Sequence, residues 1–430
     1  MLLGLAGLLT AGLVALLGLA WSWLPTQEEM AARIGDGFHD RTGVQVDLSH
    51  VHWSLWPQPT LVIENAVTRQ ASPILARRIR LQASWASVLR RQPTLQEVHL
   101  DGMVVPQVSL REFRDNGADQ DGADPAARWP PGGLQLRFRD LTWINRRGIE
   151  LDYEGSFALD EDALPRRARV ARAGSHPSTQ LRLEREGAED RWRVLIDVPG
   201  GSLNGQAQLA RGPAGRLRIT AQLEPKNIDV EALLAVFKRH SVVAGRANGN
   251  ATLSAEGDSP ASLLRSLRTN THFLLRPARL TRFDLMKVVQ SAGASDRGQT
   301  MLDELSGVLD TQNTASNGTQ YRYSALAARS GLLSASGHVR LLRNRLDGEL
   351  AVDLVDGVVG IPLTVSGTVE EPKLGMTGGA LAGAAVGTAV LPGVGTAIGA
   401  RVGRQVERLL DEPAKQAPGE SPAAPAKPRR

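Results

Sequence analysis

The amino-acid sequence predicts a mostly β protein with a few α-helices, in which a long, curled antiparallel sheet forms a groove behind one N-terminal transmembrane helix. Apolar residues fall on every second position in much of the stretch 332–374, and the same alternation recurs in short segments along most of the chain. Such segments form strands with one apolar and one polar face. Residues 1–24 carry no charged side chain, and a run of this length can cross a bilayer as a helix.

The stretch 332–374 supplies the candidate binding residues. Side chains on a strand point to opposite faces in turn, so alternate residues share a face. Arg343-Asn344 fits a tight turn, and short connections predict antiparallel neighbours. The side chains that we expect on the apolar face, as candidates for lining a groove, are Leu333, Val339, Leu341, Leu346, Leu350, Val352, Leu354, Ile361, Leu363 and Val365.

Two arrangements of this face are compatible with the sequence. About eighteen strands at ~4.8 Å each would make a sheet roughly 85 Å long, which must curl. The curled sheet either closes into a self-filled sandwich or leaves a groove lined with Leu, Val and Ile. A lipid acyl chain suits such a groove, because each buried methylene is worth ~0.8 kcal/mol and no directional bond is needed.

Composition argues against two classes of function. The 430 residues carry a formal net charge of +5, but the basic residues are dispersed between apolar positions, whereas a nucleic-acid-binding surface would concentrate them. We therefore expect no nucleic-acid partner. The chain has no cysteine, which excludes disulfide bonds and thiolate chemistry.

The N-terminal run is interpreted as a retained membrane anchor. Trp21 and Trp23 lie at its end, where indoles favour the membrane interface. The alternative is a signal peptide cleaved near Gly18-Leu19-Ala20, which the absence of a basic start and the length of the run disfavour. A helix should follow, because Thr26 and Glu29 have the spacing of a capping box and Gly43 fits its end.

Patterning divides the chain into seven segments. In order they are an anchor (1–24), a helix plus β module (25–111), a mobile polar loop (112–131), a central β-meander (132–225), an α/β module (226–374), a glycine-rich helical hairpin (375–410) and a disordered tail (411–430). Within them we expect separate strands over 98–100 and 105–110, and a bulge near Asp140, where the apolar parity changes. Short helices are expected over 229–238, 259–267 and 283–290.

The segment 375–410 repeats glycine on a four-residue grid, which is typical of helices that pack closely through bare faces. Its second half places Arg401, Arg404 and Arg408 on one side, which suits an anionic membrane surface. A flexible Gly/Ala segment with no special role is an equally good interpretation of this composition.

Motifs that carry catalysis or bind metal are not found. The chain contains no phosphate-binding loop, nucleophile elbow or HExxH sequence. His50 and His52 would share one side of a strand, but no third ligand is evident nearby. Asp160-Glu161-Asp162 and Glu370-Glu371 are interpreted as solvated loop charges rather than an acid/base pair. We therefore expect no enzymatic activity, no cofactor and no metal.

Several stretches, taken together, resemble the AsmA-like family of envelope proteins. The resemblance at the N-terminal side lies in the order of features: a membrane helix, an amphipathic helix and then strands. It is carried by Arg41-Thr42-Gly43, Trp56-Pro57-Gln58-Pro59-Thr60 and Leu95-Gln96-Glu97-Val98-His99-Leu100-Asp101-Gly102. The C-terminal match is stronger and includes Asn227-Ile228-Asp229, Ser336-Gly337-His338-Val339-Arg340-Leu341 and Ile361-Pro362-Leu363-Thr364-Val365-Ser366-Gly367-Thr368. The chain departs from the family in its compact length and in its glycine-rich segment.

The resemblance implies a single-pass protein of the inner membrane of a Gram-negative bacterium, with the bulk of the chain in the periplasm. It further implies a role in outer-membrane biogenesis or lipid homeostasis, in which a β-groove carries phospholipid tails, and it supplies no catalytic residues. The expected partners are membrane lipids, the inner membrane, and outer-membrane assembly or lipid-transport proteins. The alternative functions are a non-enzymatic scaffold that assists assembly or insertion of outer-membrane proteins and, from a third class, an envelope hydrolase.

Overall fold

A computed structural model describes residues 27–86, 95–111, 133–161, 164–175, 178–187, 190–212, 216–258, 260–291, 294–314, 318–331, 333–354 and 361–376 of the chain. Most of these residues are in strands, and the strands form one long, mainly antiparallel sheet, so the prediction of a mostly β fold is confirmed. The chain divides into two compact units. Unit 1 comprises residues 1–241, 245–273 and 309–319, and unit 2 comprises residues 242–244, 274–308 and 320–430.

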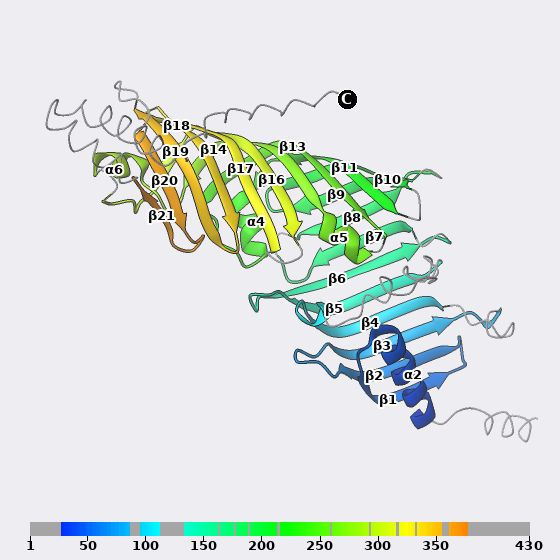
Figure 1. The fold of residues 1–430 in the computed structure, drawn as a ribbon. Helices are drawn as coiled ribbons and strands as arrows, with labels where there is room; N and C mark the ends of the chain where they lie inside the picture. The colour runs from blue at the N-terminus through cyan, green and yellow to red at the C-terminus, as the bar shows by residue number, and fades with distance from the viewer. Residues whose placement is uncertain are drawn as a thin grey trace, which may run out of the picture. The chain divides into compact units, whose positions relative to one another are not determined.

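Unit 1 begins with helix α2 (Gln27–Thr42) and continues as strands that follow one another in sequence order (Figure 1). A short 3-10 turn, η1 (Ser109–Arg111), follows β4, and helices α4 (Val230–Val236) and α5 (Pro260–Ser266) flank the last strand. The strands are β1 (Val46–Ser54), β2 (Thr60–Thr68), β3 (Leu75–Ala83), β4 (Leu95–Pro106), β5 (Gln135–Ile144), β6 (Glu150–Leu159), β7 (Pro165–Arg172), β8 (Gln180–Arg185), β9 (Arg191–Val198), β10 (Gly201–Arg211), β11 (Leu217–Lys226), β12 (Ile228–Asp229) and β13 (Val243–Gly257).

Unit 2 contains helix α6 (Leu285–Gln290) and the C-terminal strands. Its strands are β15 (Thr300–Leu302), β18 (Leu333–Leu342), β19 (Arg345–Leu354), β20 (Ile361–Gly367) and β21 (Pro372–Gly375). Strands β14 (Arg268–Leu280), β16 (Glu304–Thr314) and β17 (Gly318–Arg329) have residues in both units. The main chain at Leu374 in β21 donates to Asp296, which ties the segment after α6 to this strand at 3.1 Å.

The predicted helix after the apolar run is confirmed as α2. Its first turn carries Glu28 and Glu29, which favour the positive end of the helix dipole. It ends at Gly43, which has φ +74° and whose N–H donates to the His39 carbonyl at 2.7 Å. Met30, Ala31 and Ile34 pack against the buried Val51, Ile63, Ala66 and Ala76, so α2 covers the apolar face of β1–β3 (Figure 1).

One pairing contradicts the expectation of a wholly antiparallel sheet. β4 and β5 are parallel, with Leu100 beside Phe138. A parallel pair needs a connection of a dozen or more residues, and the stretch between β4 and β5 is long enough. The separate strands predicted over 98–100 and 105–110 are also wrong, because β4 is continuous and Gly102, with φ +65°, absorbs the irregularity.

Other local predictions are confirmed. Arg343 and Asn344 have φ values of +49° and +70°, as a two-residue hairpin turn between β18 and β19 requires. The register between β5 and β6 shifts between Phe138 and Leu141, around Asp140 with φ +50°, where the bulge is expected. The three short helices correspond to α4, α5 and α6, with Asp229 and Asp284 as N-caps of α4 and α6.

Several predicted segments lie outside the described residues. These are the anchor (1–24), the loop (112–131), the tail (411–430) and nearly all of the glycine-rich segment (375–410). Within the described part of the chain, no helix combines the length and the apolar character that crossing a membrane requires.

Candidate functional site

The apolar face of unit 1 is continuous from strand to strand, because apolar side chains or glycine occupy paired positions of neighbouring strands. One such line of cross-strand partners, here called the apolar row, takes one residue from each strand of β1–β11 and from β13. Its members are Trp53, Leu61, Leu81, Val98, Leu136, Phe157, Ala168, Leu183, Val194, Gly205, Leu223 and Ala251.

Coverage of the apolar row changes along the sheet. At β1–β3 the members Trp53, Leu61 and Leu81 are half-buried, and Leu61 packs against the cluster that α2 covers. At β9–β13 Val194, Leu223 and Ala251 are buried by side chains of the neighbouring strands, and no residue of a described helix belongs to their cluster. Between these ends, Val98, Leu136 and Phe157 are only half-buried. Every member of the row over β1–β6 therefore keeps some accessible apolar surface.

Aromatic rings lie close to the sheet in this half-buried stretch. Phe138 stacks with Phe157 at a centroid distance of 6.2 Å. Gly155, the cross-strand partner of Phe138, makes room for the ring: a β-carbon at Gly155 would approach the Phe138 ring within 2.6 Å. The Phe138 ring can thus lie against the backbone at Gly155, so it projects little from the sheet over β5 and β6.

In unit 2, the described residues of the predicted groove lie on one face of β18–β20. The register pairs Ala335 with Val352, Leu341 with Leu346 and Leu350 with Leu363, so the alternation in the sequence was read in the correct phase. Five of the ten are buried: Leu333, Val352, Ile361, Leu363 and Val365. Four are half-buried, Val339, Leu341, Leu346 and Leu350, and the side chain of Leu354 lies outside the described residues.

This division separates a packed end of the face from an accessible end. Val352 and Leu363 are 0% exposed, so they are core residues with no surface left for a ligand. The half-buried residues cluster toward the Arg343-Asn344 turn, on the same face as Tyr321 and Tyr323 of β17. Any ligand on this face would therefore contact the turn end of β17–β19.

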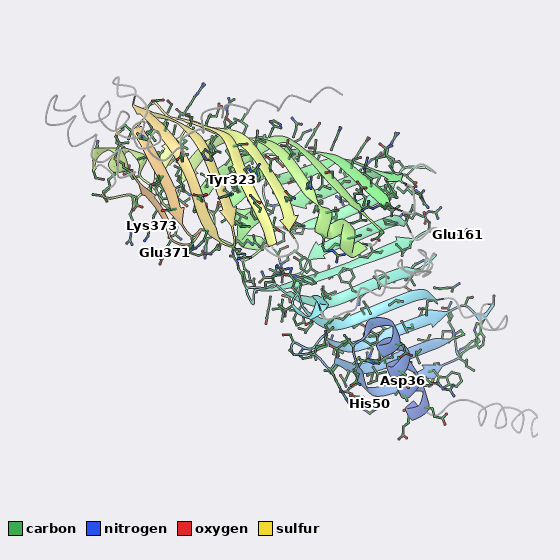
Figure 2. The ribbon with its side chains drawn as sticks, viewed as in Figure 1. Asp36, His50, Glu161, Tyr323, Glu371 and Lys373 are labelled. Atoms are coloured by element: carbon green, nitrogen blue, oxygen red, sulfur yellow. The ribbon has the colours of Figure 1, made fainter. Side chains whose placement is uncertain are left out.

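Tyr323 is a polar group on this mostly apolar face (Figure 2). Part of its surface is exposed, yet burial raises the pKa of its hydroxyl to about 12, with the neighbouring Tyr321 adding to the shift. A tyrosine hydroxyl is neutral at physiological pH, so the face carries no charge at this point, and the raised pKa extends this to higher pH.

Two arginines flank the apolar face at opposite ends of β7 and β8. Arg172 closes β7 opposite Tyr153, and its guanidinium lies 5.6 Å from the centre of the Tyr153 ring. Arg185 closes β8 opposite Trp192 in the same way, also at 5.6 Å. The amphipathic edges of the face are thus formed by guanidinium groups stacked on aromatic rings.

The charges of these arginines are largely compensated. Arg185 pairs with Asp160 and, at 2.6 Å, with Asp190, so it is a structural group rather than an anion site. Arg172 donates to the Asp152 carbonyl at 2.5 Å and faces the Asp152 carboxylate at 3.8 Å. Burial raises the pKa of Tyr153, and the charge of Arg172 opposes this shift.

The opposite face of the sheet is charged and laced by cross-strand ion pairs. Examples are Arg78–Glu64 at 3.0 Å, Arg137–Glu97 at 3.2 Å, Arg182–Asp197 at 2.9 Å, Arg218–Glu256 at 3.0 Å and, in unit 2, Arg340–Asp347 at 2.8 Å. Most of these side chains are well exposed, so each pair adds little stability. Their effect is to keep this face in water, which leaves the apolar face as the candidate binding surface.

The remaining sequence candidates are separate from this face. His50 and His52 are exposed on β1, and no group of three His, Asp or Glu residues in the described ranges is placed to hold a metal ion (Figure 2). The interpretation of 160–162 as solvated charges is wrong for Asp160, which pairs with Arg185. Trp21, Trp23, Arg401, Arg404 and Arg408, predicted at the membrane interface, lie outside the described residues.

Sequence reasoning missed Arg172, Arg185 and Tyr323. A signal was present: Leu181, Leu183 and Arg185 occupy alternate positions, so an arginine falls on the apolar side of a strand. It was overlooked because β7 and β8, with few large aliphatic residues, were not recognised as strands.

Comparisons of the chain with protein-family models, with curated proteins and with solved structures find no match. The resemblance to the AsmA-like family stays a prediction from the sequence, and the candidate function rests on the two faces of the sheet.

Proposed function

We propose that this chain is a membrane-anchored periplasmic protein that binds phospholipid acyl chains along the apolar face of its sheet, in outer-membrane biogenesis or lipid homeostasis. The observation that carries the proposal is the apolar row, which is half-buried in every strand from β1 to β6 and packed at β9–β13. The anchor and the compartment rest on the uncharged N-terminal run and the family resemblance.

The dimensions and energies suit a carrier. The five strand spacings of ~4.8 Å between β1 and β6 cover about 24 Å, enough for an extended acyl chain of about sixteen carbons. Burying half of about fourteen methylenes would give about 5–6 kcal/mol. A free energy of that size corresponds to a dissociation constant between about micromolar and millimolar. Binding would thus be reversible, as transfer of lipid from one membrane to another requires.

Lipid analysis of the purified full chain tests this proposal. The chain is extracted from membranes in mild detergent, and co-purified lipid is quantified by mass spectrometry. Leu136→Asp on β5 and Leu341→Asp on β18 place a charge on the apolar face. Gln135→Asp and Ser336→Asp place the same charge on exposed, opposite-facing positions of the same strands.

We expect the two apolar-face variants to lose most of the co-purified phospholipid, while the two controls retain it at the wild-type level. Circular dichroism verifies that each variant is folded. Absence of phospholipid from the wild-type chain would contradict the proposal, and crosslinking of that lipid-free chain to outer-membrane assembly proteins would instead support the scaffold function.

A further inference from the structure

Exposed apolar side chains gather at one end of the first four strands. Trp56 is 84% exposed and Leu55 43% exposed in the loop between β1 and β2. Trp85 follows β3, and Leu95 opens β4 as the cross-strand partner of Ala83. The Trp85 indole donates to the Pro57 carbonyl at 3.1 Å, which joins this end of β3 to the β1–β2 loop. We call Leu55, Trp56, Trp85 and Leu95 the Trp56 patch.

The loop that presents Trp56 is fastened at both ends. The Ser54 hydroxyl donates to the Trp56 carbonyl at 2.9 Å, and the Thr60 hydroxyl donates to the Gln58 carbonyl at 2.9 Å. A large indole held in water by an ordered loop is unfavourable unless something else covers it. Indoles gain most at the membrane–water interface, where the ring is apolar and the N–H stays wet.

Helix α2, which begins at the first described residue, packs on β1–β3, the strands whose ends carry most of the Trp56 patch. Gly35 lies beside the Val46 carbonyl, while Met30 and Ile34 pack toward the cluster around Val51. Figure 1 shows α2 crossing over β1–β3, with its N-terminal end on the β1 side of the sheet. Residues 24–26, at most about 10 Å of chain, separate the expected anchor from α2, so the anchor would keep this part of unit 1 close to the bilayer.

The apolar row starts at this end as well. Its first members are successive cross-strand partners near the end of the strands that leads into the β1–β2 loop: Trp53, Leu61, Leu81 and Val98. The Trp56 patch is thus continuous in sequence with the first members of the row, since Trp53 and Leu55 are separated only by Ser54.

We propose that the Trp56 patch inserts into the interfacial layer of the bilayer that holds the N-terminal segment. This inference rests on the proposed function, because it takes residues 2–23 as the anchor. Unit 1 is then held at the membrane by two contacts instead of one, and the start of the apolar row faces the lipid. An acyl chain leaving the bilayer would meet Trp53 and Leu61 before any charged side chain of the opposite face.

The absence of native cysteine allows a single reporter to be placed on the full chain. Trp56→Cys carries an environment-sensitive fluorophore in the patch. Ala71→Cys is the matched control, because Ala71 is exposed in the turn between β2 and β3, at the opposite end of the same strands. Both variants are reconstituted into vesicles of phosphatidylethanolamine and phosphatidylglycerol, with and without a nitroxide on the acyl chains.

In vesicles, we expect the label at position 56 to emit at a shorter wavelength than the same label exposed to buffer without detergent. Its fluorescence should be quenched strongly by the nitroxide on the lipid and only weakly by aqueous iodide. The label at position 71 should behave in the opposite way. Equal quenching of both labels by iodide, in a chain that remains in the vesicles after carbonate washing and still carries phospholipid, would overturn the inference and leave the proposed function standing. A chain that carbonate removes from the vesicles and that holds no lipid would overturn both.

Discussion

At the scale of single residues, the informative positions are polar side chains on faces that are otherwise aliphatic. Tyr323 and Arg185 each bring a functional group to the side of the sheet that carries Leu, Val and Phe. Each is accommodated differently. The tyrosine hydroxyl is neutral, and burial raises its pKa further, whereas the arginine lies beside two carboxylates. Both solutions allow a polar group next to apolar surface without leaving an uncompensated charge.

The tyrosine gives a pH-dependent prediction. The pKa of Tyr323 is about 12 in the folded chain, against an ordinary value of 10.0. Below pH 10 the hydroxyl is protonated in both the folded and the unfolded chain, so it does not change the free energy of unfolding. Between pH 10 and 12 the unfolded chain loses this proton more readily than the folded chain, so stability falls as the pH rises. Absorbance at 295 nm should show Tyr323 as the last of the three tyrosines to ionise, and Tyr323→Phe should remove that last component.

The same substitution should reduce the loss of stability between pH 10 and 12 by about 2 kcal/mol in urea unfolding monitored by circular dichroism. If the tyrosines of the wild-type chain titrate together near pH 10, the Tyr323 hydroxyl is not buried in the way described.

Arg185 gives a prediction on stability. Arg185→Met would leave the Asp160 and Asp190 carboxylates, which are only 18% and 29% exposed, without their shared partner. Removing one partner of a buried pair typically costs about 3 kcal/mol or more. Arg340→Met, which breaks the well-exposed pair with Asp347, should cost at most about 1 kcal/mol. Equal unfolding free energies for the two variants would show that the Arg185 pair is not structural.

At the scale of elements, the sequence predicted those structures whose cause is local. The Arg343-Asn344 turn, the bulge at Asp140 and the end of α2 at Gly43 each depend on one or two residues with a special backbone conformation, and all three are confirmed. Strands β18–β20 were predicted in the correct phase because large aliphatic residues occupy most alternate positions there, with small residues in the others.

Elements with a nonlocal cause were missed. β7 and β8 are rich in arginine and have few large apolar residues, so their strand character comes from pairing with β6 and β9. The parallel pairing of β4 with β5 depends on where a long connection returns to the sheet, which alternation does not encode. The same distinction applies to the candidate site. Which residues share the apolar face was predictable from the sequence, but the exposure of each residue depends on what packs over it.

The parallel pairing can be tested by disulfide formation, because the chain has no native cysteine. Glu97 faces Gln135, and Asp101 faces Arg139, in the parallel register. The double variants Glu97→Cys/Gln135→Cys and Asp101→Cys/Arg139→Cys should crosslink under mild oxidation, because cross-strand partners are close enough for a disulfide.

The pair Glu97→Cys/Arg139→Cys is the control, because these positions are separated by about 13 Å along a parallel pair and would meet only in an antiparallel one. Efficient crosslinking of this control, with none of the two parallel pairs, would contradict the topology. Mobility shifts on denaturing gels without reductant provide the measurement.

At the scale of the whole molecule, the account depends on the chemical difference between the two sides of each unit. In both units the apolar residues of successive strands share one face, and ion pairs such as Arg182–Asp197 and Arg340–Asp347 share the other. Some of the apolar surface is sealed, at Val352 and Leu363, and some stays half-buried, at Leu136 and Leu341. A self-filled core would need only the sealed part. The accessible part is what the proposed lipid binding uses.

Site-specific photocrosslinking in living cells tests this claim most directly. A benzophenone amino acid replaces Leu136 or Leu341 on the apolar face, and Gln135 or Ser336 on the opposite face of the same strands. After irradiation, the full chain is purified and its mass is measured. The account predicts phospholipid adducts at positions 136 and 341 and none at 135 and 336. Crosslinks only to other side chains of the protein at 136 and 341, with no lipid adduct, would contradict it.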